Sequence, residues 1–216
     1  MIRTILVLGL LAGMAACGSA PQRWTPEEKE RIGENADAGK MRVYRIDRAD
    51  DSLFLRRRAQ ELHPEDLLSS SYRILKERLL RTVNDPADPG VGIAAPQAGI
   101  SRRLIAVQRF DRDSAFRFYA NPRLDYRSPQ QAWGPEGCLS VPERTDSVLR
   151  AREIVVSYVD DVTLETRRDT VRGFTAVIFQ HEIDHLDGIL FIDRAAGGGM
   201  VMREPADSVP AGLPEP

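Results

Sequence analysis

Apolar residues recur at helical spacing in the segment between residues 64 and 83. The repeated positions lie three or four residues apart and are Leu68, Tyr72, Leu75, Leu79 and Val83. Side chains at this spacing share one face of a helix. Pro64 can open that helix, because proline suits the first helical turn. We therefore expect a structural helix with one buried face.

A second segment with helical spacing begins at Phe174. Its repeated positions are Phe174, Val177, Ile178, His181 and His185. Since all of them share one helical face, the pattern predicts that the two histidines continue a buried stripe. Between the two helices, short apolar runs at residues 104–107, 116–119 and 154–159 are typical of strands. The pattern thus predicts an α+β domain with mixed β strands around a central helix.

The two ends of the chain lack these periodic patterns. Residues 17–40 are polar apart from scattered positions and contain several prolines and glycines, so we expect a flexible tether. Residues 196–216 are rich in glycine and proline, which interrupt helices and strands, so we expect a disordered tail. The folded domain is therefore expected over residues 41–195.

The first 16 residues have the features of a secretory signal. Arg3 supplies positive charge, residues 5–11 form a short apolar core, and small residues precede Cys17. This order resembles a bacterial lipoprotein signal, which implies removal of residues 1–16 and lipid attachment to Cys17. The apolar run is shorter than the about 20 residues of a membrane-spanning helix. We expect an exported lipoprotein anchored in a lipid bilayer, on the periplasmic side or at the outer membrane.

Composition limits the remaining possibilities. The 216 residues are 42% apolar and 29% charged, which suits one globular domain. Lys plus Arg number 30 against 32 Asp plus Glu, and no long block of one sign occurs. A nucleic-acid partner is therefore not expected. The two cysteines, Cys17 and Cys138, lie in such different contexts that we assign them separate roles, and we expect a monomer.

The sequence His181-Glu182-Ile183-Asp184-His185 is an H-E-x-x-H motif on the second predicted helix. Helical geometry directs both imidazoles toward one point, and the glutamate beside them can act as a base. A catalytic metal site needs three protein ligands and an open position for water. The motif therefore predicts a site for one divalent metal ion and requires a third ligand elsewhere.

Three sources could supply that third ligand. A third histidine six residues after the motif is typical of one class of zinc proteases, but Phe191 occupies that position. A downstream glutamate would have to be Glu204 or Glu215, and both lie in the proline-rich tail. Cys138 remains, and a thiolate with two imidazoles is a sound tetrahedral set.

Three separated motifs resemble those of the peptide deformylase family, in the family's order. They are Gly90–Gln97 (GVGIAAPQ), Glu136–Ser140 (EGCLS) and Gln180–Gly188 (QHEIDHLDG). The likeness extends over about residues 41–194, with Ile93 standing where the family usually has leucine. Three motifs in order are specific evidence, whereas one could arise by accident. The resemblance implies a peptide deformylase-like fold around a metal-binding helix.

The resemblance also implies roles for the residues near the metal. Glu182 would act as the general acid and base, and Gln97 with the backbone N–H of Leu139 would stabilise the developing oxyanion. Glu136 would pair with Arg150 and fix the loop of the metal-binding cysteine. The metal would be Fe²⁺ by resemblance, although Zn²⁺ suits the same ligands in an exported protein. The implied metal ligands are Cys138, His181 and His185.

Substrate contacts follow from the same resemblance. Val91 and Gly92 would meet the main chain of a peptide as an added strand, with Gly137 across from them. Val177 and Ile178 are candidates for the pocket that takes a methionine side chain, and core packing explains them equally well.

These observations predict an enzyme that hydrolyses the N-formyl group of N-formyl-methionyl peptides and releases formate, outside the cytoplasm. Two alternatives stay open. The first is an exported H-E-x-x-H metallopeptidase, which would need a third ligand other than Cys138. The second is a non-catalytic peptide-binding lipoprotein of the same fold.

Overall fold

A computed structural model describes residues 23–33 and 39–195 of the chain. Its main sheet has five antiparallel strands in the order β1-β2-β3-β6-β7, and β4 pairs with β5 in a separate two-stranded ribbon. The sheet strands are β1 (Gly92–Ala94), β2 (Leu104–Gln108), β3 (Phe116–Arg127), β6 (Glu153–Val159) and β7 (Thr166–Arg172). The ribbon strands are β4 (Gln131–Cys138) and β5 (Val141–Ala151).

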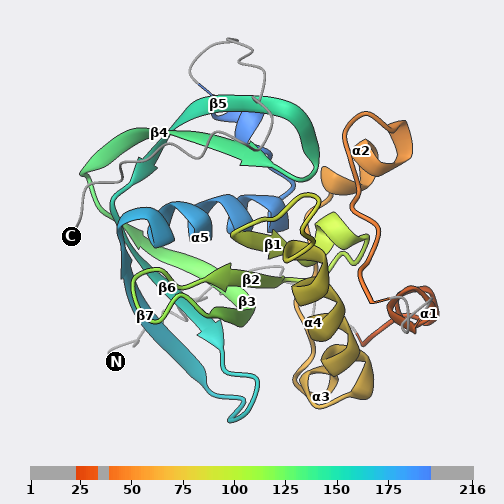
Figure 1. Ribbon diagram of the computed structural model, residues 1–216. Helices are drawn as coiled ribbons and strands as arrows, with labels where there is room; N and C mark the ends of the chain where they lie inside the picture. The colour runs from red at the N-terminus through yellow and green to blue at the C-terminus, as the bar shows by residue number, and fades with distance from the viewer. Residues whose placement is uncertain (1–22, 34–38, 196–216) are drawn as a thin grey trace, which may run out of the picture.

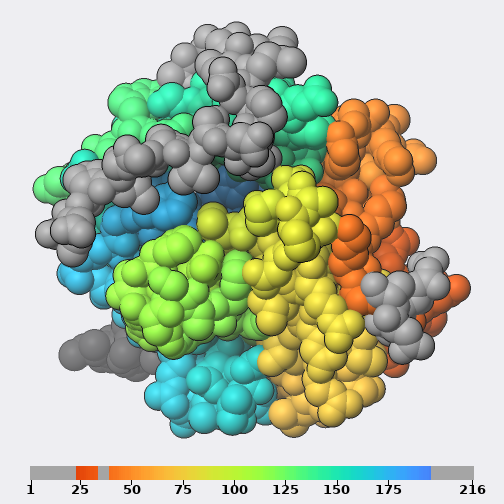
Figure 2. Space-filling view, in the orientation of Figure 1, coloured from red at the N-terminus to blue at the C-terminus, as the bar shows by residue number. Residues whose placement is uncertain are grey.

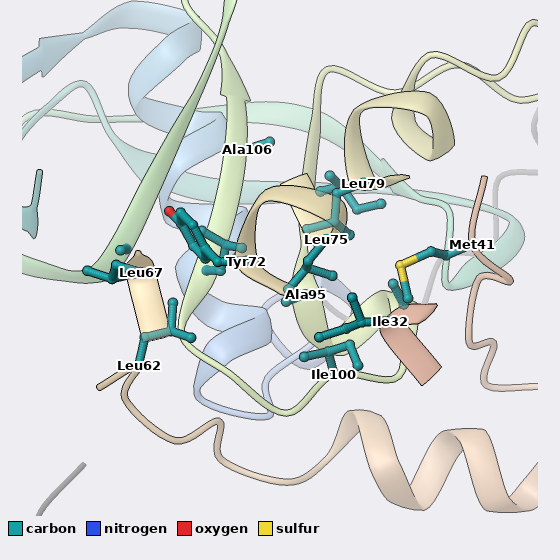
Figure 3. Packing of buried hydrophobic residues seen from close by; sticks show 14 of the residues in the cluster. Ile32, Met41, Leu62, Leu67, Tyr72, Leu75, Leu79, Ala95, Ile100 and Ala106 are labelled. Carbon is teal, nitrogen blue, oxygen red and sulfur yellow. The ribbon is translucent and has the colours of Figure 1, made fainter. Parts of the chain in front are cut away.

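The sheet is covered by a helix on each face, which explains the fully apolar run in β2. Leu104 and Ala106 belong to one buried cluster with α4 (Ser70–Val83), whereas Ile105 and Val107 belong to another with α5 (Gly173–Leu186). Successive residues of a strand point to opposite faces, so both sets are buried. Tyr72, Leu75 and Leu79 of α4 form part of the first cluster (Figure 3).

Helix α5 lies between the sheet and the ribbon (Figure 1). Its Phe179, Ile183 and Leu186 pack on the sheet, and the ribbon arches over the opposite side. After the helix, Gly188 adopts a left-handed conformation with φ +74°, and a Cβ there would overlap the backbone oxygen of Arg56. Because α5 is covered on both sides, it is apolar over most of its circumference. The α+β fold and the central helix expected from the sequence are confirmed.

The prediction that Pro64 opens the first long helix was wrong. Pro64 opens a separate short helix, α3 (Pro64–Leu67), and the side chain of Ser69 caps α4 by accepting a hydrogen bond from the backbone N–H of Tyr72. A serine cap fixes a helix start because it satisfies an otherwise unpaired donor. Leu68 lies between the two helices and is exposed, instead of belonging to the buried face.

Part of the expected tether is folded, so that expectation was wrong for residues 23–33. Helix α1 (Pro26–Gly33) packs beside α4, and Trp24 and Ile32 are buried in the first cluster. Arg102 donates to both carboxylate oxygens of Glu28, at 2.7 and 2.6 Å. Figure 2 shows this red-orange segment and the orange α2 (Ala49–Leu55) along one flank, beside the yellow α4.

The predicted signal with Cys17 and the tail at 196–216 lie outside the described residues. Within the described ranges, none of the helices is both long and apolar enough to cross a bilayer.

Candidate active site

Cys138, His181 and His185 converge between the ribbon and α5. The two histidines lie one helical turn apart with ring centroids 5.0 Å apart, and Cys138 ends β4. Cys138 Sγ lies 3.2 Å from His185 Nε2, and one donor atom from each of the three residues lies within 4.8 Å of the others. A thiolate and two imidazoles so placed fit a tetrahedral divalent ion with a fourth position left open.

A chain of buried polar contacts orients His181. Its Nδ1 lies 2.8 Å from Glu136 Oε2, which leaves Nε2 available for a metal. Arg150 donates to Glu136 at 2.7 and 3.0 Å and to Asp184 at 2.5 Å, so the pairing of Glu136 with Arg150 expected from the sequence is present. Burial alone would raise the pKa of Glu136, but its hydrogen bonds to Arg150 and His181 outweigh burial and lower it to about 2. Glu136 is therefore an ionised acceptor.

Glu182 has an environment suited to proton transfer. The side chain is 3% exposed, and its Oε2 has no hydrogen-bond partner among the described residues. Burial raises its pKa to about 7, against the positive charges of His181 and Arg150, which lower it. A carboxylate whose pKa lies near neutral pH can both take and return a proton. The unpartnered oxygen can accept a hydrogen bond from a water molecule or a substrate.

Gln97 is held with its amide donor toward the cysteine. It belongs to the 3-10 helix η2 (Ala95–Ala98), where its Oε1 accepts a hydrogen bond from the backbone N–H of Ala94 at 2.9 Å. Its Nε2 then lies 3.2 Å from Ser140 Oγ and 3.5 Å from Cys138 Sγ. Leu139, which follows the cysteine, contributes to the same wall. The side-chain amide of Gln97 thus lies beside the candidate metal position.

A pocket opens beside these groups, bounded by β1, β4 and α5. Figure 2 shows the blue surface of α5 between the green ribbon and the lime segment that includes β2. His185 and Arg150 are buried outside the lining, and Cys17 lies outside the described residues. The predicted site residues that line the pocket are Val91, Gly92, Gln97, Glu136, Gly137, Cys138, Leu139, Val177, Ile178, His181 and Glu182.

The sequence reasoning missed several residues of this region. Phe174, expected on the buried stripe, is 50% exposed and lines the pocket together with Pro135. Gln180 exchanges hydrogen bonds with both backbone groups of Ala151, at 3.1 and 2.9 Å, and so fixes α5 to the ribbon. The motif that begins at Gln180 contained this signal, because a buried amide needs partners. Nothing in the periodic pattern distinguished Phe174 from a core residue.

Comparison with known proteins gives a consistent result. The model of the polypeptide deformylase family matches residues 43–199. A peptide deformylase of Desulfotalea psychrophila is 41% identical over 129 residues, which are 56% of this chain and 75% of the relative. A peptide deformylase of Caulobacter vibrioides is 36% identical over 155 residues, covering 71% of this chain and 86% of the relative.

The solved structures that this chain resembles are also those of peptide deformylases. A class I type b peptide deformylase of Acinetobacter baumannii with Met-Ala-Ser bound has 34% identity and a TM-score of 0.64, covering 72% of this chain and 98% of that one. The same enzyme bound to actinonin gives 34% identity and a TM-score of 0.64 over 73% and 99% of the two chains. The peptide deformylase of Thermotoga maritima has 30% identity and a TM-score of 0.64 over 73% and 98%.

Proposed function

The chain belongs to the polypeptide deformylase family and is an enzyme of that type, and we propose that it hydrolyses the formyl group of N-formyl-methionyl peptides outside the cytoplasm with the residues described above. The observation that carries the assignment of roles is the buried Glu182, whose unpartnered oxygen lies beside the Cys138, His181 and His185 cluster. A base, three metal ligands and two hydrogen-bond donors in one pocket are the parts that amide hydrolysis requires.

The metal would be held by Cys138, His181 and His185. When bound, it supplies positive charge that polarises the formyl carbonyl and makes water a better nucleophile. Glu136 holds the imidazole of His181 through Nδ1, and Arg150 in turn holds Glu136. These contacts keep the ligands in place before substrate arrives.

The remaining steps use side chains and backbone groups of the pocket. Glu182 takes a proton from the attacking water as the water oxygen bonds to the formyl carbon. Gln97 Nε2 and the backbone N–H of Leu139 donate to the oxyanion, a contribution worth about 10²- to 10³-fold per donor. The C–N bond then breaks, Glu182 returns the proton to the amine nitrogen, and formate and the free peptide leave.

Two free strand edges can hold the peptide main chain. β1 pairs only with β2 and β4 only with β5, so within the described sheets each has an unpaired edge. Gly92 of β1 with the preceding Val91 on one side, and Gly137 of β4 on the other, line the pocket. An extended peptide bonded to such edges would be oriented by its backbone, with its first side chain against Val177 and Ile178.

Formate release tests this function directly. The purified, metal-loaded protein is incubated with formyl-Met-Ala-Ser and, separately, with unformylated Met-Ala-Ser. We expect formate from the first peptide and no change in the second. Cleavage of a peptide bond would favour the exported metallopeptidase, and binding without turnover would favour a non-catalytic peptide-binding lipoprotein.

Export and lipid attachment rest on residues 1–17. The positively charged n-region, the short apolar core and Cys17 support the proposal. A Cys17→Ala variant should lose lipid and remain uncleaved or soluble. Recovery of lipidated protein from that variant would contradict the lipoprotein assignment.

The compartment also affects which metal ion the site would hold. Resemblance implies Fe²⁺, but ferrous iron beside the thiolate of Cys138 is vulnerable to oxygen, and an exported protein lacks cytoplasmic reductants. We therefore propose Zn²⁺ or another redox-inert ion in protein recovered from its exported location. Near-stoichiometric iron with an unoxidised cysteine in air would contradict this choice.

A further inference from the structure

The direction of side chains along β4 defines one wall of the pocket. Glu136 lies 2.8 Å from His181, and Cys138 lies 3.2 Å from His185, so both side chains face α5. Residues two apart on a strand share a face. Gly134 therefore also faces α5, one step farther from the metal ligands. One helical turn before His181, this part of α5 presents Val177 and then Phe174.

Two observations, one on each element, indicate space that the described side chains do not fill. A Cβ added to Gly134 would meet no atom of the described chain within 4 Å. On the opposite element, Phe174 is 50% exposed although most of α5 is buried. Phe174 lines the pocket, and Gly134 directly precedes the lining residue Pro135, on the side of β4 away from Cys138. The end of the pocket at Phe174 is open, whereas the end at Glu182 is closed.

The aromatic wall at the open end is fixed from behind. The ring of Phe174 packs against Phe110, with centroids 5.6 Å apart. The buried side chain of Arg109 donates to Asp111, and the backbone N–H of Asp111 donates to Thr175 Oγ1 at 3.2 Å. The loop that carries Phe110 is thus bonded to the first turn of α5. The wall is formed before any ligand binds.

The chemistry of this end selects an apolar occupant. The apolar side chains that line it are those of Phe174, Val177 and Ile178, whereas the polar lining residues Gln97, Glu136, His181 and Glu182 lie toward the candidate metal ligands. A charged side chain would find no charged partner among these apolar side chains, and an apolar one would be partly removed from water. An aromatic ring would gain an offset or edge-to-face contact with Phe174.

We propose that the pocket is extended past Gly134, so that this enzyme accepts formylated peptides whose first side chain is bulkier than methionine, with aromatic side chains included. The proposal rests on the deformylase function proposed above and adds the substrate class. Gly134 sets the length of the pocket, and Phe174 forms the surface on which the longer side chain rests.

The test compares kcat/KM for formyl-Phe-Ala-Ser and formyl-Met-Ala-Ser in the full, metal-loaded protein. In the parent we expect the two values to lie within about tenfold of each other. Gly134→Val fills the open space and should lower the Phe-to-Met ratio by about tenfold or more, since one or two methylene groups in an apolar pocket discriminate to that extent. Gly134→Ala should lower the ratio by less.

Matched variants keep the result interpretable. Gly33 ends α1, away from the pocket, and a Cβ there also meets no atom of the described chain within 4 Å, so Gly33→Ala should leave the ratio unchanged. If Gly134→Val does not fold by circular dichroism, Phe174→Ala provides the second test. It should lower the same ratio about threefold or more by removing the aromatic contact.

The outcomes separate the two proposals. A parent that prefers formyl-Met by more than about 100-fold, or a ratio that is unchanged in Gly134→Val and Phe174→Ala, would overturn the extended pocket and leave the deformylase function intact. Absence of formate from both peptides would instead overturn the proposed function.

Discussion

Gly92, which lines the pocket, and Gly134, which precedes the lining residue Pro135, have opposite surroundings. At Gly92 of β1, a Cβ would overlap Glu182 Oε1 and lie 2.8 Å from Ile178 Cγ2, whereas at Gly134 of β4 it would meet no atom of the described chain within 4 Å. Gly92 has no room for a side chain because its backbone approaches the Glu182 carboxylate closely. Gly134, by contrast, leaves open space beside β4. The end of the pocket at Glu182 is thus sterically fixed, and the end at Phe174 is open.

The largest effect is expected at the fixed end, from Glu182→Gln. The amide keeps the shape of the carboxylate but cannot take up a proton. We expect kcat to fall by about 10²- to 10⁴-fold, while metal content stays that of the parent. Formate release and elemental analysis check the two parts. Activity within a few-fold of the parent would contradict a catalytic role for Glu182.

The comparison of the two glycines is tested by adding the same atom to each. Gly92→Ala must displace Glu182 or Ile178, and a displacement of about 1 Å at the reacting groups can cost about 10²-fold in rate. The loss of kcat/KM for formyl-Met-Ala-Ser should be at least about tenfold smaller in Gly134→Ala. Equal losses of kcat/KM in the two variants would mean that Gly92 is no more sterically restricted than Gly134.

The polar contacts behind the metal ligands should have an intermediate effect. Glu136→Ala leaves His181 Nδ1 without its acceptor, and Arg150→Ala leaves Glu136 without its main partner. We expect each variant to weaken metal affinity about 10- to 100-fold. The double variant should lose little more than either one, because the two residues act as a unit. Titration with a metal chelator measures the metal affinity of each variant. Additive losses in the double variant would mean that Glu136 and Arg150 act independently.

The smallest effect is expected at the open end, from Phe110→Ala. This residue supports the ring of Phe174, and an aromatic pair contributes about 0.5–1.5 kcal/mol. The Phe-to-Met ratio of kcat/KM should fall about two- to threefold. A larger effect than that of Phe174→Ala would show that Phe110 itself contacts the substrate.

The sequence predicted the fixed end of the pocket better than the open end. His181, Glu182 and His185 stand in one short motif on a periodic helix, so their convergence follows from local geometry. Cys138 could be added because its motif matched a family in sequence and order. Each of these two motifs spans only a few consecutive positions. A single sequence is therefore enough to recognise them.

The open end depends on contacts between distant segments. The strand β4 contains Gly134, Pro135 and Gly137 and lacks the alternation of apolar and polar residues that indicates a strand, because it forms a ribbon over α5 instead of a sheet face. Phe174 fits the helical period, yet it is 50% exposed. Trp24 and Ile32 were similarly missed, since two isolated apolar residues in a polar stretch do not make a periodic pattern.

The central claim is that water attacks the formyl carbon of the substrate in this pocket. Turnover of formyl-Met-Ala-Ser in ¹⁸O-labelled water, followed by mass spectrometry of both products, tests it most directly. We predict one ¹⁸O atom in the released formate and none in the Met-Ala-Ser product. Label in a peptide carboxylate, with the formyl group still attached to methionine, would contradict the claim and identify a peptidase.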